Sequence, residues 1–427
     1  MANLLGVAME ILSTGDKIRR ARIYEGITLK ELCEDKISIS KMSCIENGKV
    51  KADEDTLRYI AKKLKVNYDY LVQDIREQIE ENIKIIDKGN LPRKELLDLI
   101  KYILNYSIRC EYYDLAFIII HKLFLIFKNN NDLELMQLII DKYYEIYKKN
   151  EIRENTLIYY NDMATFFMKI KEYHEAINYY DKILTILKED NFSDRDTYIR
   201  ASFYQGVCYM KIGEIEKSYS LVENIIADIE CIEDVSLKGI IYHVFACLSI
   251  LSYSVNTDKY IKLSYEYLGR DRKYLGKSKS RIGRYFYQVG NDERGKKETS
   301  DAMKVSCEDE SNVCIDVLID CVETFYIYKE YELADEMIDK VLNLSICSDD
   351  TALIERAYYF KGMILQKQGL FRQAEMYMNI STDYFLKSAN DEETCKRYTE
   401  MAEMYYNIGD PREAIKYFTL AMNLEKN

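Results

Sequence analysis

Proline and glycine are scarce in this sequence. The 427 residues hold only two prolines and sixteen glycines, and tryptophan is absent. Average usage is roughly 5% proline and 7% glycine. Proline fixes the backbone and removes an amide donor, which makes it common in turns and at strand edges but rare inside helices. The shortage argues against a proline-punctuated β-sandwich, and we expect an all-α protein of long helices joined by tight turns.

Long apolar stretches and paired cysteines are missing as well. No run of about 18 apolar residues is present, and the opening MANLLGVAMEILSTGDK lacks the pattern of a secretory leader. We therefore expect a cytoplasmic chain. Eleven cysteines are scattered without a C-x-x-C pair, and this pattern favours buried thiols over a zinc or redox site.

Signatures of catalysis are not found either. There is no phosphate-binding loop, no G-x-S-x-G and no metal-ligand spacing, and His121, His174 and His243 stand alone in helical contexts. We expect no enzymatic activity, no cofactor and no metal.

Charge is distributed unevenly along the chain. Residues 1–72 carry thirteen lysines and arginines against eleven acids, whereas the rest of the chain carries 47 against 61. A mildly basic head on an acidic body is typical of a protein whose head alone meets a polyanion.

Turn and cap residues divide the head into five short predicted helices, over 16–24, 29–34, 39–46, 53–64 and 70–72. Thr28 and Glu31 form a predicted capping box, and Ser38 is the predicted N-cap of the third helix. Asn47-Gly48 ends that helix, because glycine accepts the left-handed conformation at a helix C-terminus.

The head resembles the lambda-repressor-like, or XRE-type, helix-turn-helix family. The resemblance is carried by R-x-x-x-G-I-T-L-x-E-L, by I-E-N-G-K, and by L-x-x-I-A-x-x-L-x-V-x-x-x-x-L. It implies an ion pair between Arg22 and Glu46 that fixes the first helix against the third. The second turn departs from the family pattern, because Cys33 occupies a slot that is usually small and Asp35-Lys36-Ile37 lacks the usual glycine or alanine.

In such a motif the third helix enters the major groove. Ile39, Ser40, Ser43 and Cys44 are then placed near base edges. The full set of expected DNA-contacting residues combines these readers with the helix cap and the phosphate-binding side chains: Thr28, Lys30, Ser38, Ile39, Ser40, Lys41, Ser43, Cys44, Lys49 and Lys51. A head kept only as a protein-docking module is the alternative.

Beyond a predicted linker helix over 73–92, the chain repeats a unit with two small residues twelve apart. The pairs are Ala164/Ala176, Gly206/Ser218, Gly283/Gly295, Val322/Ala334, Gly362/Ala374 and Ala402/Ala414. Small residues at these positions let the two helices of a hairpin approach closely. The pattern resembles tetratricopeptide repeats with a period near 40, one degenerate unit near Tyr260 and weak repeats between 93 and 150. We expect a right-handed solenoid of helical hairpins.

A head of this kind joined to such an array resembles the peptide-responsive RRNPP regulators, and most of all the RstA-type regulators of clostridia. The resemblance implies a DNA-binding domain over 1–72, a linker over 73–92, and a peptide-binding and dimerisation domain over 93–427. It further implies a homodimeric, quorum-sensing-type transcription factor on double-stranded promoter DNA, controlling genes of sporulation, virulence or motility. The alternative is an adaptor whose array binds a phosphorelay or other regulatory protein, with DNA binding secondary.

The short signalling peptide would lie on the concave face of the array. Their positions relative to the first small residue of each repeat place the following side chains on that face or beside it: Asn161, Arg200, Phe203, Arg284, Tyr287, Glu323, Tyr326, Tyr359 and Gln366. An asparagine can bond a peptide backbone as donor and acceptor, and arginine can hold a carboxylate bidentately. For each of them a solvated surface residue is the alternative.

Overall fold

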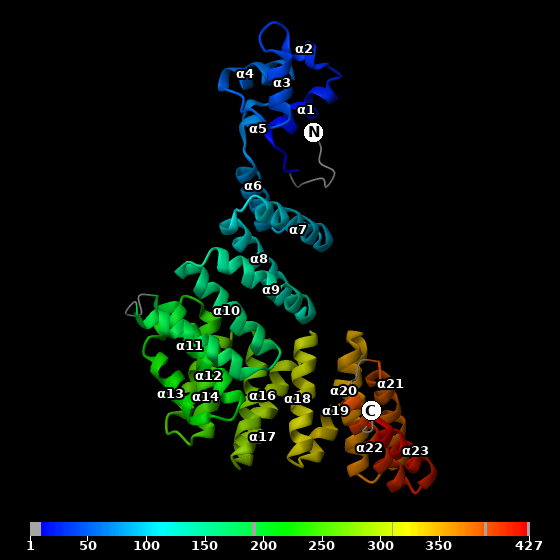
Figure 1. Cartoon of the computed structure of the whole chain (residues 1–427). Helices are drawn as coiled ribbons and strands as arrows, with labels where there is room; N and C mark the ends of the chain where they lie inside the picture. Colours follow the sequence, from blue (N-terminus) through cyan, green and yellow to red (C-terminus); the bar gives the residue numbers. More distant parts are fainter. Residues whose placement is uncertain (1–9, 190–193, 310, 388–390, 425–427) are drawn as a thin grey trace. The chain divides into compact units, whose positions relative to one another are not determined.

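The computed structural model describes residues 10–189, 194–309, 311–387 and 391–424. Within these ranges the protein is all-helical, with 23 α-helices, one short 3-10 helix and no strand (Figure 1). The helices form two compact units, Met1–Ile183 and Leu184–Asn427. None of the described helices is long and apolar enough to cross a membrane.

The first unit begins with five short helices, and their bounds are α1 Thr14–Tyr24, α2 Leu29–Cys33, α3 Ile39–Glu46, α4 Glu54–Lys63 and α5 Tyr68–Val72. Each starts at a side chain that accepts from the first-turn backbone: Ser13, Thr28, Ser38, Asp53 and Asn67. The capping box of Thr28 and Glu31 is present. These caps satisfy backbone amides that a short helix otherwise leaves without a partner.

Close contact between α1 and α3 holds the head together. Gly15 lies so near the end of α3 that a Cβ there would stand 2.4 Å from the carbonyl oxygen of Ile45. Around this contact the head buries one apolar cluster that includes Ile18, Met42 and Ile60. Only a residue without a side chain permits this approach.

The first unit continues with longer helices, and their bounds are α6 Ile75–Asp87, α7 Arg93–Arg109, α8 Tyr113–Asn129, α9 Leu133–Lys149, α10 Arg153–Lys169 and α11 Tyr173–Glu189, the last of which crosses the boundary between the units. The segment 73–92, predicted as a linker, holds α6. Its Ile79, Ile83 and Ile86 are buried in the same cluster as residues of α7 and α8.

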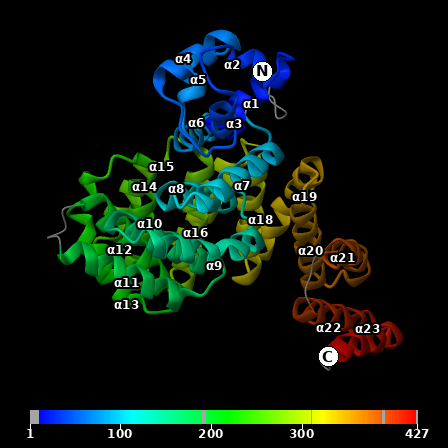
Figure 2. The same cartoon turned by 45° about the horizontal axis from the view of Figure 1, so that its top comes forward.

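The described part of the second unit forms six helical hairpins. Their helices are α12 Arg195–Lys211, α13 Ile215–Ile226, α14 Val235–Leu251, α15 Thr257–Leu268, α16 Arg272–Gln288, α17 Asp292–Ser306, α18 Asn312–Ile327, α19 Tyr331–Ser348, α20 Thr351–Lys367, α21 Phe371–Phe385, α22 Asp391–Ile408 and α23 Pro411–Leu424, with the 3-10 helix η1 Ile229–Cys231 between α13 and α14. The paired helices α22 and α23 lie side by side in both views (Figures 1 and 2).

The predicted small residues lie where the two helices of each hairpin meet. A Cβ on Gly283 would stand 2.3 Å from Oγ1 of Thr299, and one on Gly206 would stand 3.0 Å from Cγ2 of Val222. The degenerate unit predicted near Tyr260 is the hairpin α14–α15, in which the Tyr260 ring packs 4.4 Å from that of Phe245. The predicted repeat register is therefore that of the fold.

A single turn geometry closes most hairpins. The second residue after the first helix is left-handed at Gly213, Gly290 and Gly369, with φ between 76° and 84°. The same place is left-handed, without glycine, at Glu111, Asn131, Lys171, Tyr253 and Lys329. In each case the next amide bonds back into the helix, as from Glu214 to the carbonyl of Tyr209 at 2.9 Å. The turn thus recurs where glycine does not mark it.

Candidate functional site

Helix α3 is anchored by its inner face and leaves its outer face open. Met42 and Ile45 are buried in the head core. On the opposite face Ile39 is 49% exposed and Ser40 is exposed, while Ser43 and Cys44 are half-buried. The N-terminal half of α3 therefore presents a small, weakly polar surface to solvent.

The C-terminal end of α3 is fixed by the ion pair that the resemblance implied. Nε and Nη2 of Arg22 donate to the two carboxylate oxygens of Glu46 at 2.7 and 3.0 Å. Nη1 of Arg22 also donates to the carbonyl of Ile27 at 3.1 Å. The side chains of Arg22 and Glu46 are only 15% and 5% exposed. Because both charges are largely removed from water and meet in bidentate geometry, the pair sets the orientation of α3 against α1.

The expected phosphate-binding side chains are all on the surface. Lys30, Lys49 and Lys51 are exposed, as are Thr28 and the cap residue Ser38. They surround α3, since they lie on α2, at the start of α2 or α3, and in the loop after α3. All five side chains are therefore accessible to solvent.

Lys41 is exposed too, but it already has a partner. Its Nζ lies 3.1 Å from Oδ2 of Asp53, the N-cap of α4. Hydrogen bonds from Thr56 and from Lys41 hold the pKa of Asp53 well below its usual range, so this carboxylate is ionised at neutral pH. A phosphate that takes Lys41 must therefore compete with Asp53.

Sequence reasoning missed two residues of the head. Asn47 follows α3 directly and is exposed, and its Nδ2 donates to the carbonyl of Ser43 at 2.7 Å. Lys17 is 1% exposed and donates from Nζ to the carbonyls of Tyr70 and Gln73, both at 2.7 Å. Burial lowers the pKa of Lys17 to about 8. The sequence assigned Asn47 to a helix end and gave no sign that a lysine would be buried.

In the second unit, three neighbouring first helices of hairpins share a charged face. From α16, Arg284 lies 3.4 Å from Glu323 of α18 and donates to Oγ1 of Thr324 at 3.1 Å. From α20, Arg356 pairs with Asp316, with Asp320 at 2.6 Å and with Glu323 at 3.5 Å. Three carboxylates of α18 therefore face two guanidinium groups.

The same face continues onto α22. The Tyr359 hydroxyl donates to Glu400 at 3.1 Å, and Arg397 lies over the Tyr359 ring at 4.4 Å while pairing with Glu355 at 2.8 Å. Two further residues predicted for this face, Tyr326 and Gln366, are half-buried.

The remaining predicted face residues are placed differently. Phe203 and Tyr287 are 1% and 3% exposed and pack inside the unit, so they are not available to a ligand at the surface. The ring of Tyr287 packs over Gly295 of α17, where a Cβ would stand 2.6 Å from it. Arg200 is half-buried and pairs with Asp196 at 2.6 Å. Asn161 is exposed on α10 in the first unit.

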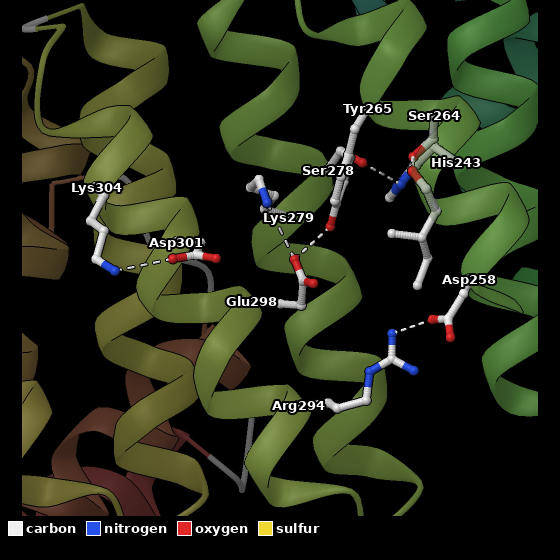
Figure 3. A network of polar contacts seen from close by, with 11 residues as sticks. His243, Asp258, Ser264, Tyr265, Ser278, Lys279, Arg294, Glu298, Asp301 and Lys304 are labelled. Carbon is white, nitrogen blue, oxygen red and sulfur yellow. Dashed lines mark hydrogen bonds and ion pairs between the residues drawn. The ribbon is translucent and has the colours of Figure 1, made fainter.

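The degenerate hairpin contributes a polar network that sequence reasoning did not find. Nδ1 of His243 lies 2.8 Å from Oγ of Ser278 (Figure 3). Both residues are buried, and burial lowers the pKa of His243 to about 3. Nearby, the Tyr265 hydroxyl donates to Glu298 at 2.6 Å, and Lys279 approaches the same carboxylate at 3.5 Å.

A serine beside a histidine is the arrangement of a nucleophile and its base, but here both residues are buried, with His243 7% and Ser278 2% exposed. The network instead ties α14 to α16 and α15 to α17. No three histidine, cysteine or acidic side chains of the described residues are grouped to hold a metal ion.

No protein-family model matches this sequence, and no curated protein matches it. Among solved structures, the apo form of the quorum sensor NprR from Bacillus thuringiensis is 14% identical, with a TM-score of 0.48 over 82% of this chain and 98% of that chain. The apo form of RapI gives the same identity and TM-score, over 82% and 96%. PlcR from Bacillus thuringiensis, in complex with the peptide PapR7 and DNA, is 16% identical, with a TM-score of 0.27 over 86% and 98%. At such identities these are likenesses of helical fold.

Proposed function

We propose that this protein is a transcription regulator that binds double-stranded DNA through residues 1–72. The observation that carries the proposal is α3, whose open face holds Ile39 and Ser40 while its far end is fixed by the pair Arg22–Glu46. A helix held in this way can enter a major groove with its first residues at the base edges. Four surface lysines around it supply phosphate contacts.

The side chains on the open face of α3 determine how the head can distinguish one DNA sequence from another. A serine hydroxyl bonds donors or acceptors, and an isoleucine can touch a thymine methyl, but none of these side chains makes a bidentate contact with one base. Asn47 can do so after it gives up its bond to Ser43. We therefore propose that DNA shape contributes much of the selectivity.

The test is fluorescence anisotropy of the full chain on a promoter fragment, measured at two salt concentrations. Replacing Lys41 and Lys49 by alanine removes two phosphate contacts, so the slope of log affinity against log salt should fall by about two. The matched control replaces Lys262 and Lys304, which are 78% and 77% exposed and lie in the second unit. It removes the same charge away from the head.

The proposal is supported if DNA binding is weakened by the Lys41 and Lys49 replacements and not by the Lys262 and Lys304 replacements. An equal loss in both variants assigns the binding to overall charge, and no binding by the unaltered protein overturns the proposal.

We further propose that the array over 93–427 binds a short peptide that changes DNA binding, as in quorum-sensing-type regulation of sporulation, virulence or motility genes. The supporting feature is the charged face with Arg284, Glu323 and Arg356, which offers donors and acceptors from three neighbouring helices. Since three carboxylates of α18 face two guanidinium groups, this face suits a peptide that carries a positive group. Phe203 and Tyr287 are left out of the site because they are buried.

Calorimetry with a set of short synthetic peptides, with and without lysine or arginine, tests this second proposal. Glu323→Gln should weaken binding of the cationic peptides, while Glu332→Gln, an exposed acid on α19, should not. If no peptide binds, the array is better explained by the adaptor function, in which its ligand is a phosphorelay or other regulatory protein.

A further inference from the structure

Residues 10–12 precede the helices of the head in the chain, but their contacts are with α6 and α7, which follow the head. Ile11 is 1% exposed and is buried in the apolar cluster that α6, α7 and α8 share. The head has a separate apolar cluster, in which Ile18 and Leu71 are buried. Among the described residues the chain therefore passes between the head and these later helices twice, once after residues 10–12 and once between α5 and α6.

Hydrogen bonds hold residues 10–12 in place. The amide of Ile11 donates to the hydroxyl of Tyr102 on α7 at 2.9 Å. The amide of Leu12 donates to Oε1 of Gln78 on α6 at 2.9 Å, and Nε2 of Gln78 donates back to the carbonyl of Leu12 at 2.9 Å. Gln78 is 2% exposed. Breaking this reciprocal pair would leave a buried amide group without these partners, which is unfavourable.

At the second passage the connection between the head and α6 is very short. Only Gln73 and Asp74 lie between α5 and α6. Nζ of Lys17, on α1, donates to the carbonyls of Tyr70 and Gln73, both at 2.7 Å, and Lys17 is 1% exposed. A buried ammonium group needs such acceptors, so Gln73 is held together with the head. The remaining joint between the head and α6 is at Asp74, the N-cap of α6.

The two passages together determine whether the head can turn. A body attached at one joint can rotate about it, whereas a body attached at two separate places cannot rotate without breaking one attachment. Ser13, the N-cap of α1, follows Leu12 directly, so no slack separates residues 10–12 from the head. Turning the head about Asp74 therefore requires residues 10–12 to leave their place on α6 and α7.

We propose that residues 10–12 are a strap that fixes the head to α6 and α7, and that release of this strap frees the head to turn about Asp74. The protein then has two states, one with a fixed head and one with a mobile head, and the contacts of the strap set the balance between them. The strap can be measured without DNA, so its failure and the failure of DNA binding are distinguishable.

The experiment is the decay of tryptophan fluorescence anisotropy in the full chain, without DNA. The sequence has no tryptophan, so Tyr68→Trp places a single fluorophore on α5 in the head. With the strap bound, the head should turn only as part of the first unit, Met1–Ile183. Ile11→Asp puts a charge into the apolar cluster and should release the strap. The released head should add a phase at least about 2.5-fold faster, because the rotational correlation time follows the volume of the turning body.

Ile118→Asp is the matched control, because it makes the same substitution in the same unit at a side chain that is 42% exposed on α8. Circular dichroism and the tryptophan emission maximum check that each variant keeps its helices and its folded head. If Ile11→Asp loses them, Gln78→Leu replaces it, since it removes the reciprocal pair without adding a charge. Its control is Gln137→Leu, at an exposed glutamine on α9.

A fast phase in the folded strap variant, together with a slow decay in its control, supports the proposal. The proposal is overturned if the protein with an unaltered strap already shows the fast phase, because its head then turns freely. It is overturned too if the folded strap variant shows no faster phase than its control.

Discussion

The pair Arg22–Glu46 makes the head sensitive to the loss of one side chain. Arg22→Met removes the partner of Glu46 and leaves a carboxylate whose side chain is 5% exposed without its guanidinium. Removing one member of a buried pair costs about 3–5 kcal/mol. A head of this size has a total stability of roughly 4–10 kcal/mol, taken at about 0.05–0.15 kcal/mol per residue. The substitution should therefore remove much of it.

The unfolding assay uses the absence of tryptophan from the sequence. Because the chain has no tryptophan, Tyr68→Trp puts a single fluorophore at a half-buried position on α5. Urea unfolding followed at this tryptophan reports the head inside the full chain. With a slope near 1 kcal/mol per molar urea, the midpoint should fall by about 3 M or more.

Two further variants make the reasoning refutable. Arg58→Met breaks an exposed pair with Glu54 in the same head, with side chains 60% and 65% exposed, and should cost less than about 1 kcal/mol. Combining Arg22→Met with Glu46→Leu removes both buried charges and should restore most of the stability. If Arg22→Met shifts the midpoint no further than Arg58→Met, the structural role of the pair is refuted.

Three other predictions follow from single sites. Gly369→Ala should lower the stability of the second unit in thermal melts by about 1 kcal/mol, because the residue has φ +76° and no atom near its absent Cβ; no loss would contradict this account of the turn. The pKa of Lys17 is about 8 in the folded head and 10.5 in the unfolded chain, so between these pH values the unfolded state binds more protons. The contribution of Lys17 to the free energy of unfolding should therefore rise as the pH goes from about 8 to 10.5. Urea midpoints of the unaltered protein should rise over this range relative to those of Lys17→Met, and parallel pH profiles of the two proteins would contradict the prediction. A thiol reagent should modify the exposed Cys231 and Cys347 in the native protein. Cys247 should react only on unfolding, because burial hides its thiol and raises the pKa of that thiol to about 12. Rapid modification of Cys247 in the native protein would contradict its burial.

Much of the local structure could be predicted from the sequence. Thr28 and Ser38 mark helix starts because their side chains accept from amides of the first turn, and this interaction needs only near neighbours. The pairs of small residues gave the hairpins, since two helices can approach closely only where side chains are small. Glycine marked the left-handed turns at Gly213 and Gly369, but Lys171 adopts the same turn without any sign in the sequence.

The surroundings of the candidate site residues could be predicted less well from the sequence than the local structure, because they depend on the tertiary structure. Ile39 and Lys41 could be placed on α3 from sequence, but the pairing of Lys41 with Asp53 joins residues on different helices. Repeat register placed Phe203 on a ligand face, whereas packing turned it inward. Register cannot distinguish these outcomes, because a side chain on the edge of a helix face faces solvent or core according to how the next helix crosses it.

The sequence by itself determined that the chain is helical, where most helices begin and how the hairpins repeat, because caps, turns and helical spacing act over a few residues. Only the tertiary structure decided that Lys17 is buried, that the carboxylates of α18 meet Arg284 and Arg356, and that Ile11 is buried against α6 and α7. Each of these depends on which surface a neighbouring helix covers, and that is set by the packing of whole helices.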